Sequence, residues 1–230
     1  NAQVIVKYVD STNNAPLKTK NGKDELTFDF NKKEGLKAST LKANIDNNIP
    51  AGWKIAEGFT YPGDQTDNNT ITVKLVKNTV TPGEPGVTPD NPEYKDLFTT
   101  STRTINVYKT DNSAIDHTEK QTITFGRTGV LDQYTGKIME GSEGTWYVYN
   151  TTTNKLTSDK TGTWAEYTDI ATAPQGYDYM IDGVKTTEAK VAAESSVGPN
   201  TVKMIDVKYV AQDSTPVPYD PSNKDMNMDV

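Results

Sequence analysis

Apolar and polar residues alternate along the first stretch of the chain. Val4, Val6 and Tyr8 fall on one face of an extended backbone, and a polar run over residues 10–14 follows them. This period of two predicts a strand that ends in a turn. Residues 25–30 repeat the pattern, with an apolar side chain at every second position, and predict a second strand.

The hydrophobic period then changes from two to about four. Leu41, Ile45 and Ile49 lie four residues apart and are followed at once by a proline, which predicts a helix that buries this stripe and ends there. Two further strands are predicted over Trp53–Ile55 and Ile71–Val76, and the second of them alternates strongly.

This order of elements, β-β-α-β-β over residues 1–77, is that of a β-grasp, or ubiquitin-like, module. In such a module the helix lies across one face of the sheet and buries its apolar stripe there. Residues 78–92 follow, with four prolines, two glycines and few side chains to bury. We therefore predict a Pro-rich linker here, stiffened toward polyproline II.

Beyond the linker, residues 93–212 are again rich in alternating segments and turn residues. The apolar period slips between Met204 and Val207, which predicts a β-bulge or a switch of the buried face there. Residues 186–197 fit a short helix or a strand, and we favour the strand. Alternation predicts four further strands, over residues 103–108, 121–125, 146–149 and 202–210.

The polar tail over residues 213–230 carries three prolines and is predicted to be an inter-repeat linker. The sequence over residues 6–12 also resembles the sequence over residues 207–215, so the two modules are predicted to share one strand template. The predicted fold class is therefore mostly β (α+β), with two β-grasp modules in an elongated arrangement.

Composition narrows the classes of function. The 230 residues carry 24 Lys and Arg against 31 Asp and Glu, a net charge of −7, which disfavours binding to the phosphates of nucleic acids. Only 33% of the residues are hydrophobic, and no run of about 18 apolar residues occurs, so membrane insertion is not expected. The chain begins without Met or a leader pattern, so we expect it to be a segment of a longer protein.

Cysteine is absent, and His117 is the only histidine. Thiolate nucleophiles, cysteine–zinc sites and most histidine-dependent catalysis are thereby excluded, and we expect no enzyme. His117 lies in a polar turn and is predicted to be a surface residue. Loops rich in oxygen ligands make calcium a candidate cofactor, although such residues also form Asx-turns. The candidate ligands are Asp64, Asp67, Asp111 and Asp116.

Aromatic residues gather in the second half of the chain. Rings flanked by Asn, Asp and Thr suit sugars, because the C–H face of a sugar stacks on a ring while its hydroxyls take hydrogen bonds. Trp146 and Trp164 are predicted to be core anchors of a thin sheet, whereas the tyrosines are the candidate glycan contacts. Tyr147 and Tyr149 should project from one strand face. The candidates are Tyr134, Tyr147, Tyr149, Tyr177 and Tyr179.

A set of short motifs runs in order through the second module. The motif residues are Arg103–Ile105, Thr122–Phe125, Arg127–Thr128, Asp132, Thr135–Gly136, Trp164, Tyr167, Pro174, Gly176–Tyr177 and Val207–Tyr209. As a set, which covers about 110 residues, they resemble the MUB repeat of mucus-binding adhesins, the cell-wall proteins of gut lactic acid bacteria. Val6–Asp10 and Val73–Leu75 make the first module similar to the shorter MucBP-type module of such repeats.

The chain departs from this family at two places. Gly52–Trp53 stands where the family shows Gly-Tyr, and the stretch over residues 137–163 is longer than usual. A longer stretch there would alter a ligand surface, so the resemblance identifies the class of repeat more firmly than its ligand.

The resemblance implies a non-enzymatic repeat of an extracellular adhesin, attached to the cell wall of a Gram-positive bacterium. The implied partners are mucin glycoproteins and their glycans and, in some members, immunoglobulins. We expect a monomeric rod within a tandem-repeat chain, where weak single contacts add up through multivalency. The resemblance supplies no binding residue, so the candidate tyrosines rest on their own chemistry alone.

Two alternatives fit the same sequence. The first is a purely structural spacer that holds another domain away from the cell wall. The second is a protein-binding module, in which an edge strand of residues 1–77 pairs with a strand of an immunoglobulin.

Overall fold

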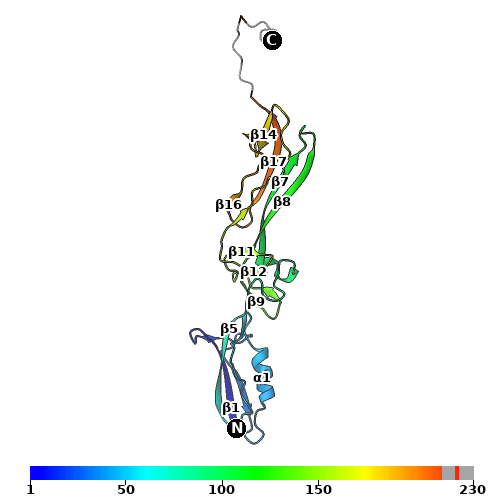
Figure 1. Cartoon of the computed structure of the whole chain (residues 1–230). Helices are drawn as coiled ribbons and strands as arrows, with labels where there is room; N and C mark the ends of the chain where they lie inside the picture. Colours follow the sequence, from blue (N-terminus) through cyan, green and yellow to red (C-terminus); the bar gives the residue numbers. More distant parts are fainter. Residues whose placement is uncertain (214–220, 223–230) are drawn as a thin grey trace. The chain divides into compact units, whose positions relative to one another are not determined.

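The structure is a computed structural model that describes residues 1–213 together with Pro221 and Ser222 (Figure 1). Strands make up most of the regular structure in these residues, which confirms the predicted mostly-β class. The predicted linker over residues 213–230 lies outside the described residues except for Asp213, Pro221 and Ser222.

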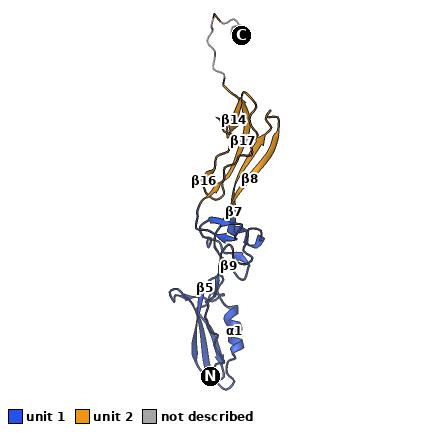
Figure 2. Cartoon of the chain, viewed as in Figure 1, with its two compact units in different colours: residues 1–99, 124–160 blue, residues 100–123, 161–230 orange. Residues whose placement is uncertain are grey.

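The chain divides into two compact units (Figure 2). Unit 1 comprises Asn1–Thr99 and Thr124–Lys160, and unit 2 comprises Thr100–Ile123 and Thr161–Val230. These boundaries differ from those of the predicted modules, because residues 124–160 return to pack with the residues that follow the first module.

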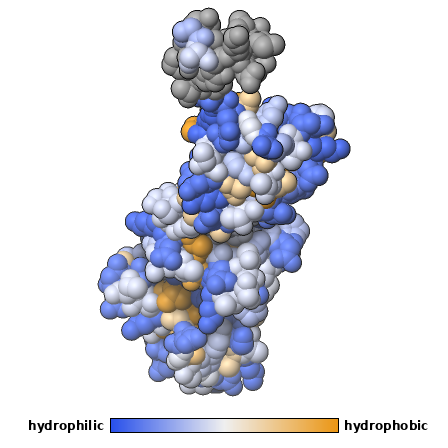
Figure 3. Space-filling model, turned by 45° about the horizontal axis from the view of Figure 1, so that its top comes forward, coloured by the Kyte–Doolittle hydropathy of each residue, from blue (hydrophilic) through white to orange (hydrophobic). Residues whose placement is uncertain are grey.

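The surface of the chain is mostly hydrophilic, with hydrophobic residues confined to small separate patches on the face shown in Figure 3. This agrees with a composition of only 33% hydrophobic residues. Among the described residues, no helix has both the length and the apolar character needed to cross a membrane.

Residues 1–77 have the strand order of a β-grasp module. Its elements are β1 (Ala2–Asp10), β2 (Pro16–Leu17), β3 (Leu26–Phe30), α1 (Ala38–Asn47), β4 (Trp53–Ile55) and β5 (Asn69–Lys77). The central strand β1 runs parallel to β5 and antiparallel to β3 and β2, and β4 pairs with the other side of β5. The first and last strands of the module therefore lie side by side.

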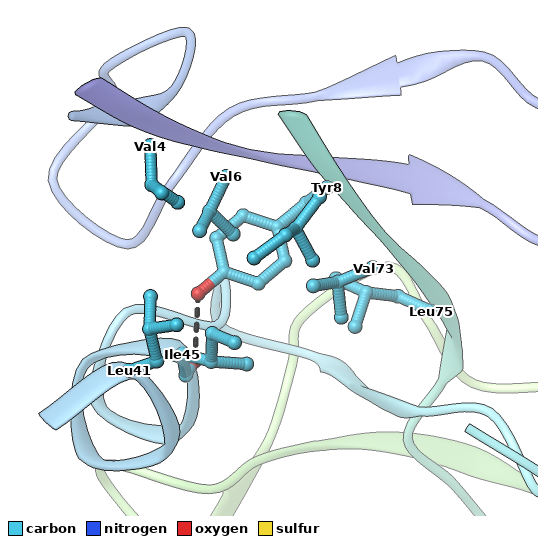
Figure 4. Close-up of a cluster of buried hydrophobic side chains, with 8 residues drawn as sticks. Val4, Val6, Tyr8, Leu41, Ile45, Val73 and Leu75 are labelled. Atoms are coloured by element: carbon cyan, nitrogen blue, oxygen red, sulfur yellow. Dashed lines mark hydrogen bonds between the residues drawn. The ribbon is translucent and has the colours of Figure 1, made fainter. Parts of the chain in front are cut away.

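The buried face of this sheet meets the predicted helical stripe (Figure 4). Leu41 and Ile45 of α1 are fully buried against β1 and β5, which confirms the stripe at these two positions. The helix ends at Asn47, so Ile49 lies beyond it and is only partly buried against the same cluster. Burial of the stripe, more than helix propensity, stabilises so short a helix.

Tyr8 joins the sheet to the helix through a hydrogen bond. Its ring is buried, and its hydroxyl donates to the main-chain oxygen of Ile45 at 2.6 Å (Figure 4). This oxygen belongs to the last turn of α1, whose carbonyls have no partner within the helix. Burial raises the pKa of Tyr8 far above its ordinary value, so the hydroxyl keeps the proton that it donates.

The structure contradicts the predicted linker over residues 78–92. β6 (Thr79–Val80) pairs with β9 (Gly129–Asp132), which in turn pairs with β10 (Lys137–Ile138). Val80 and Val87 are buried in a small cluster with Leu97. The prolines and glycines form turns, but the valines find apolar partners that lie farther along the chain, so this stretch is folded.

The remaining elements of unit 1 follow the same three-stranded sheet. They are η1 (Pro92–Leu97), β11 (Tyr147–Asn150) and β12 (Lys155–Leu156). β11 pairs with the end of β8 (Ile115–Gly126) and with β12.

Unit 2 is built on one sheet, with the strand order β8-β7-β17-β14-β15. Its further elements are β7 (Phe98–Tyr108), β13 (Gly162–Trp164), β14 (Tyr177–Ile181), β15 (Val184–Thr186), β16 (Glu194–Val197) and β17 (Val202–Ala211). β17 runs parallel to β7 and antiparallel to β14. The order β8-β7-β17-β14 repeats the order β3-β1-β5-β4 of the first module, but no helix covers the sheet in the described residues of unit 2.

In place of a helix, irregular segments cover one face of the sheet in this unit; we call them the covering segments. Ile170 and Val191 pack against the buried side chains of β7 and β17. Tyr167 and Val191 form an isolated bridge, and β13 pairs with β16. The prediction of a strand over residues 186–197 is therefore confirmed only at its two ends.

Arg103 of β7 lies beneath the covering segments, and its side chain is only 1% exposed. Its Nε donates to Gln121 Oε1 at 2.8 Å, its Nη1 donates to the oxygen of Ala192 at 2.9 Å, and its Nη2 donates to the oxygen of Ala165 at 3.0 Å. Glu194 supplies a carboxylate 3.7 Å from Nη1. One buried cation thus ties both covering segments to the sheet.

The predicted bulge in the last strand is absent. The register between β17 and β7 is unbroken from the pair Val202–Thr102 to the pair Val207–Val107. Ile205 and Val207 are buried, while Val202 and Met204 are 82% and 65% exposed. The slip in the apolar period therefore marks apolar residues on opposite faces of a regular strand.

We predict that Tyr8→Phe lowers the free energy of unfolding by about 1 to 2 kcal/mol, because a helix-end carbonyl loses its buried donor while the ring remains. Urea denaturation of the whole chain measures the loss. Tyr177→Phe is the control, since its exposed hydroxyl makes no hydrogen bond within the described residues. Equal stability of the two variants would contradict the prediction.

We predict that Arg103→Met costs about 3 kcal/mol in unit 2, because the hydrogen bonds from the buried guanidinium to Gln121, Ala165 and Ala192 are lost, while Glu194 keeps its ion pair with Lys203. Hydrogen exchange read by mass spectrometry should show lost protection in peptides around Ala165 and Ala192, while α1 keeps its protection. Lys120→Met, an exposed cation of the same unit, should change neither. Undiminished protection in Arg103→Met would refute this account of the cover.

Candidate functional site

The five candidate tyrosines lie in two different units. Tyr134, Tyr147 and Tyr149 belong to unit 1, whereas Tyr177 and Tyr179 belong to unit 2. Tyr177 is 45% exposed at the start of β14, Tyr134 is 40% exposed, and Tyr147 is half-buried on β11. Among the five candidates, only these three offer a surface to a ligand, and their role stays a prediction.

Tyr149 and Tyr179 are buried, which contradicts their choice as glycan contacts. The Tyr149 ring packs edge-on against Phe98, 5.2 Å between centroids, and its hydroxyl donates to Asn154 Oδ1 at 3.2 Å. The Tyr179 hydroxyl accepts the amide hydrogen of Ala173 at 2.9 Å. Period-two spacing predicts the face of a strand but not what covers that face, so these side chains support the fold.

The two tryptophans predicted as core anchors differ. Trp164 is 1% exposed, and its indole N–H approaches the oxygen of Ser101 at 3.4 Å. Trp146 is half-buried, and the Arg127 guanidinium lies 4.2 Å from the centre of its ring. The core prediction is confirmed for Trp164 alone.

Tyr134 lies in a turn that is hydrogen-bonded to the first module. Asp132 Oδ1 accepts the Tyr134 amide hydrogen at 2.8 Å, and the Tyr134 hydroxyl donates to the oxygen of Ile49 at 2.6 Å. Lys20 Nζ lies 3.9 Å from the ring centre. Partial burial, and then the Asp132 charge, raise the pKa of Tyr134, which keeps the hydroxyl a donor.

Gln133, which the sequence analysis did not single out, adds further hydrogen bonds between this turn and the first module. Its Nε2 donates to the oxygens of Pro50 and Trp53 at 3.2 and 3.0 Å, and its Oε1 accepts the amide hydrogen of Gly52 at 2.9 Å. A single amide side chain thus satisfies three main-chain groups of the loop between α1 and β4. The loop and the turn are therefore held in one geometry.

A hollow of about 260 Å³ opens beside this loop within unit 1. One wall comes from the loop and β4, the other from β9 and the turn that follows β10. Gly52 has a φ of +85°, and a Cβ there would lie 2.5 Å from Met139 Sδ, so only glycine allows this approach. The lining residues are Ala51, Gly52, Trp53, Lys77, Val130, Met139, Glu140, Gly141 and Ser142.

The candidate calcium ligands of unit 1 have structural partners. Asp64 Oδ1 accepts the amide hydrogen of Ala38 at 2.8 Å, at the start of α1 where a carboxylate is favourable. Asp67 lies 3.3 Å from Lys32 Nζ, and its own hydrogen bond to the amide of Asn68 is the main cause of its lowered pKa.

The candidate ligands of unit 2, Asp111 and Asp116, line one hollow of about 380 Å³ together with His117. Asp111 Oδ1 accepts the amide hydrogen of Ser113 at 3.0 Å, an Asx-turn. In the part of the chain that the structure describes, no three His, Asp or Glu side chains are grouped closely enough to hold a metal ion. Calcium binding stays a prediction.

His117 is held between two acidic residues. Its Nδ1 lies 2.7 Å from Asp116 Oδ2, and its Nε2 lies 2.9 Å from the oxygen of Asp169. The hydrogen bond to Asp116, and then the bond to the Asp169 main chain, raise the pKa of His117 above its ordinary value. Its contacts tie β8 to the covering segment of unit 2.

Comparison with known proteins finds no matching family model and no matching curated protein. Several solved structures are similar. The type 2 repeat of the mucus binding protein MUB from Lactobacillus reuteri is 19% identical, with a TM-score of 0.41 over 92% of this chain and 100% of that one. Mub-RV is 17% identical, with a TM-score of 0.45 over 93% and 100%.

A third is the MucBP domain of the adhesion protein from Pediococcus pentosaceus. It is 22% identical, with a TM-score of 0.30 over 50% of this chain and 99% of that one. These names are of the same two kinds, MUB repeat and MucBP domain, as the modules that the sequence of this chain resembles.

We predict that His117 makes the stability of unit 2 depend on pH. Because its folded pKa is raised, the protonated ring stabilises fully below the unfolded value of 6.5, and this contribution is lost as the pH rises through the folded pKa. Urea denaturation should give a lower midpoint at pH 8 than at pH 6, and the difference should shrink in His117→Gln. An NMR titration of the ring that gave a pKa of 6.5 or below would contradict this.

Proposed function

We propose that this chain is a repeat of an extracellular surface adhesin, attached to a bacterial cell wall, that binds mucin glycoproteins through their glycans without cleaving them. The observation that carries the proposal is the position of the motif residues. Arg103, Trp164 and Tyr209 are buried, and each makes a hydrogen bond that joins the layers of unit 2. The motifs that resemble MUB repeats are therefore the residues that maintain this thin fold.

The exposed surface supports an adhesive role. The small separate apolar patches on the face shown in Figure 3 suit weak contacts. Tyr134, Tyr147 and Tyr177 are the candidate stacking surfaces. Repetition of such a chain in a tandem array converts weak single contacts into firm attachment.

Immunoglobulin binding is a second candidate, favoured by the free edge of the first sheet. β3 pairs with β1 along one side, and its other side pairs with no strand among the described residues. An immunoglobulin strand added there would gain main-chain hydrogen bonds.

We predict that Tyr177→Ala weakens binding to immobilised mucin several-fold, because it removes an exposed ring whose hydroxyl bonds to nothing in the described chain. Biolayer interferometry on the whole chain measures the change. Val184→Ala, which truncates another exposed apolar residue of unit 2, is the control.

Periodate treatment of the mucin separates glycan from protein recognition, since it destroys sugar diols and should abolish binding. Wild-type chain that binds neither native mucin nor immunoglobulin would reject the adhesin proposal in favour of a structural spacer.

A further inference from the structure

We propose that the hollow beside the loop between α1 and β4 is a saccharide site that takes a neutral sugar unit of a mucin-type glycan. This rests on the proposed function and names the place of contact, which the exposed tyrosines alone do not supply. The residues that would meet the sugar are Trp53, Lys77 and Glu140.

The register of the first sheet brings two of these residues together. Trp53 of β4 and Lys77 of β5 are direct partners in an antiparallel pair, so their side chains leave the same face of the sheet next to each other. Trp53 is half-buried against the core cluster, and Lys77 is exposed at the end of its strand. A half-buried ring thus lies beside an exposed cation.

Glu140 comes from a turn that is rigidly held. The Met139 amide donates to the oxygen of Val130 at 2.8 Å, the Ser142 hydroxyl donates to the oxygen of Met139 at 2.5 Å, and that same hydroxyl accepts the Val130 amide hydrogen at 3.0 Å. The contact between Gly52 and Met139 presses this turn against the opposite wall. Both walls are set before a ligand arrives, which lowers the entropic cost of binding.

Three polar side chains of the hollow make no side-chain hydrogen bond or ion pair within the described residues, although hydrogen bonding and, to a smaller extent, the charge of Lys77 lower the pKa of Asp10. Neither Lys77 nor Glu140 forms an ion pair within the described residues, and the indole N–H of Trp53 donates to no acceptor there. In contrast, the Ser142 hydroxyl is fully used by the turn. The indole donor, the ammonium group of Lys77 and the carboxylate of Glu140 are therefore available to a ligand.

The chemistry of the lining selects the ligand class. An apolar ligand would bury Lys77 and Glu140 without hydrogen bonds, at a large cost in desolvation. An anionic ligand would meet the carboxylate of Glu140 and a chain of net charge −7. A neutral sugar has hydroxyls that both donate to a carboxylate and accept from an ammonium group, and a C–H face that packs on a ring, so it satisfies every group.

The test compares two variants of the whole chain that change charge equally. Lys77→Gln with Glu140→Gln should weaken binding of N-acetylgalactosamine and galactose about tenfold, because two charged hydrogen-bond partners are lost. Lys54→Gln with Glu57→Gln, exposed positions of the same module away from the hollow, should leave binding unchanged. NMR titration of labelled chain with each free sugar reads the affinity and places it, through shifts of the Gly52 and Gly141 amides and the Trp53 indole.

The outcomes separate this site from the proposed function. Wild-type chain that binds mucin, with no sugar-induced shifts at the hollow and equal binding by both double variants, would overturn the site and leave the adhesin proposal intact. Shifts at the hollow without mucin binding would support the site while the adhesin proposal failed. Tighter binding of N-acetylneuraminic acid than of either neutral sugar would overturn the ligand class.

Discussion

The guanidinium of Arg103 holds the layers of unit 2 together. No helix covers this sheet in the described residues, and the irregular segments above it bury few apolar side chains. Arg103 donates to one carbonyl on each covering segment, at Ala165 and Ala192, and to Gln121 on the neighbouring strand. A cation that is 1% exposed is stable in the folded state only with such partners. The covering segments and the sheet therefore depend on each other for stability.

Buried tyrosines also join layers of the structure, through hydrogen bonds from their hydroxyls to main-chain oxygens. The Tyr8 hydroxyl reaches the oxygen of Ile45 in the helix, and the Tyr209 hydroxyl reaches the oxygen of Ala171 in the cover of unit 2. The similar sequences around these residues predicted a shared strand template. However, Tyr8 lies in the first strand of its module and Tyr209 lies in the last strand of its unit, so the repeated feature is a chemical role.

Local patterns predicted the local features of this fold. The helix around Leu41 and Ile45 follows from periodicity, because its partners lie on regular strands. The burial of Val80 in the predicted linker depends on Leu97 and β9, and the burial of Tyr149 depends on Phe98. The hollow was missed for the same reason, because strand register and a turn 87 residues farther along the chain bring Glu140 to Trp53. Spacing along a chain carries no information on such distant partners.

The residues that join the layers of the fold are buried and differ from the exposed residues that line the hollow, and this difference affects which ligands the hollow can bind. Replacing Arg103 or Tyr8 removes hydrogen bonds that join layers, so these positions can vary little without loss of the fold. Lys77 and Glu140 make no ion pair within the described residues, and their replacement breaks no side-chain hydrogen bond there. The loop beside them is held instead by Gln133 and Gly52. The lining of the hollow can therefore change its ligand while the scaffold that positions it stays the same.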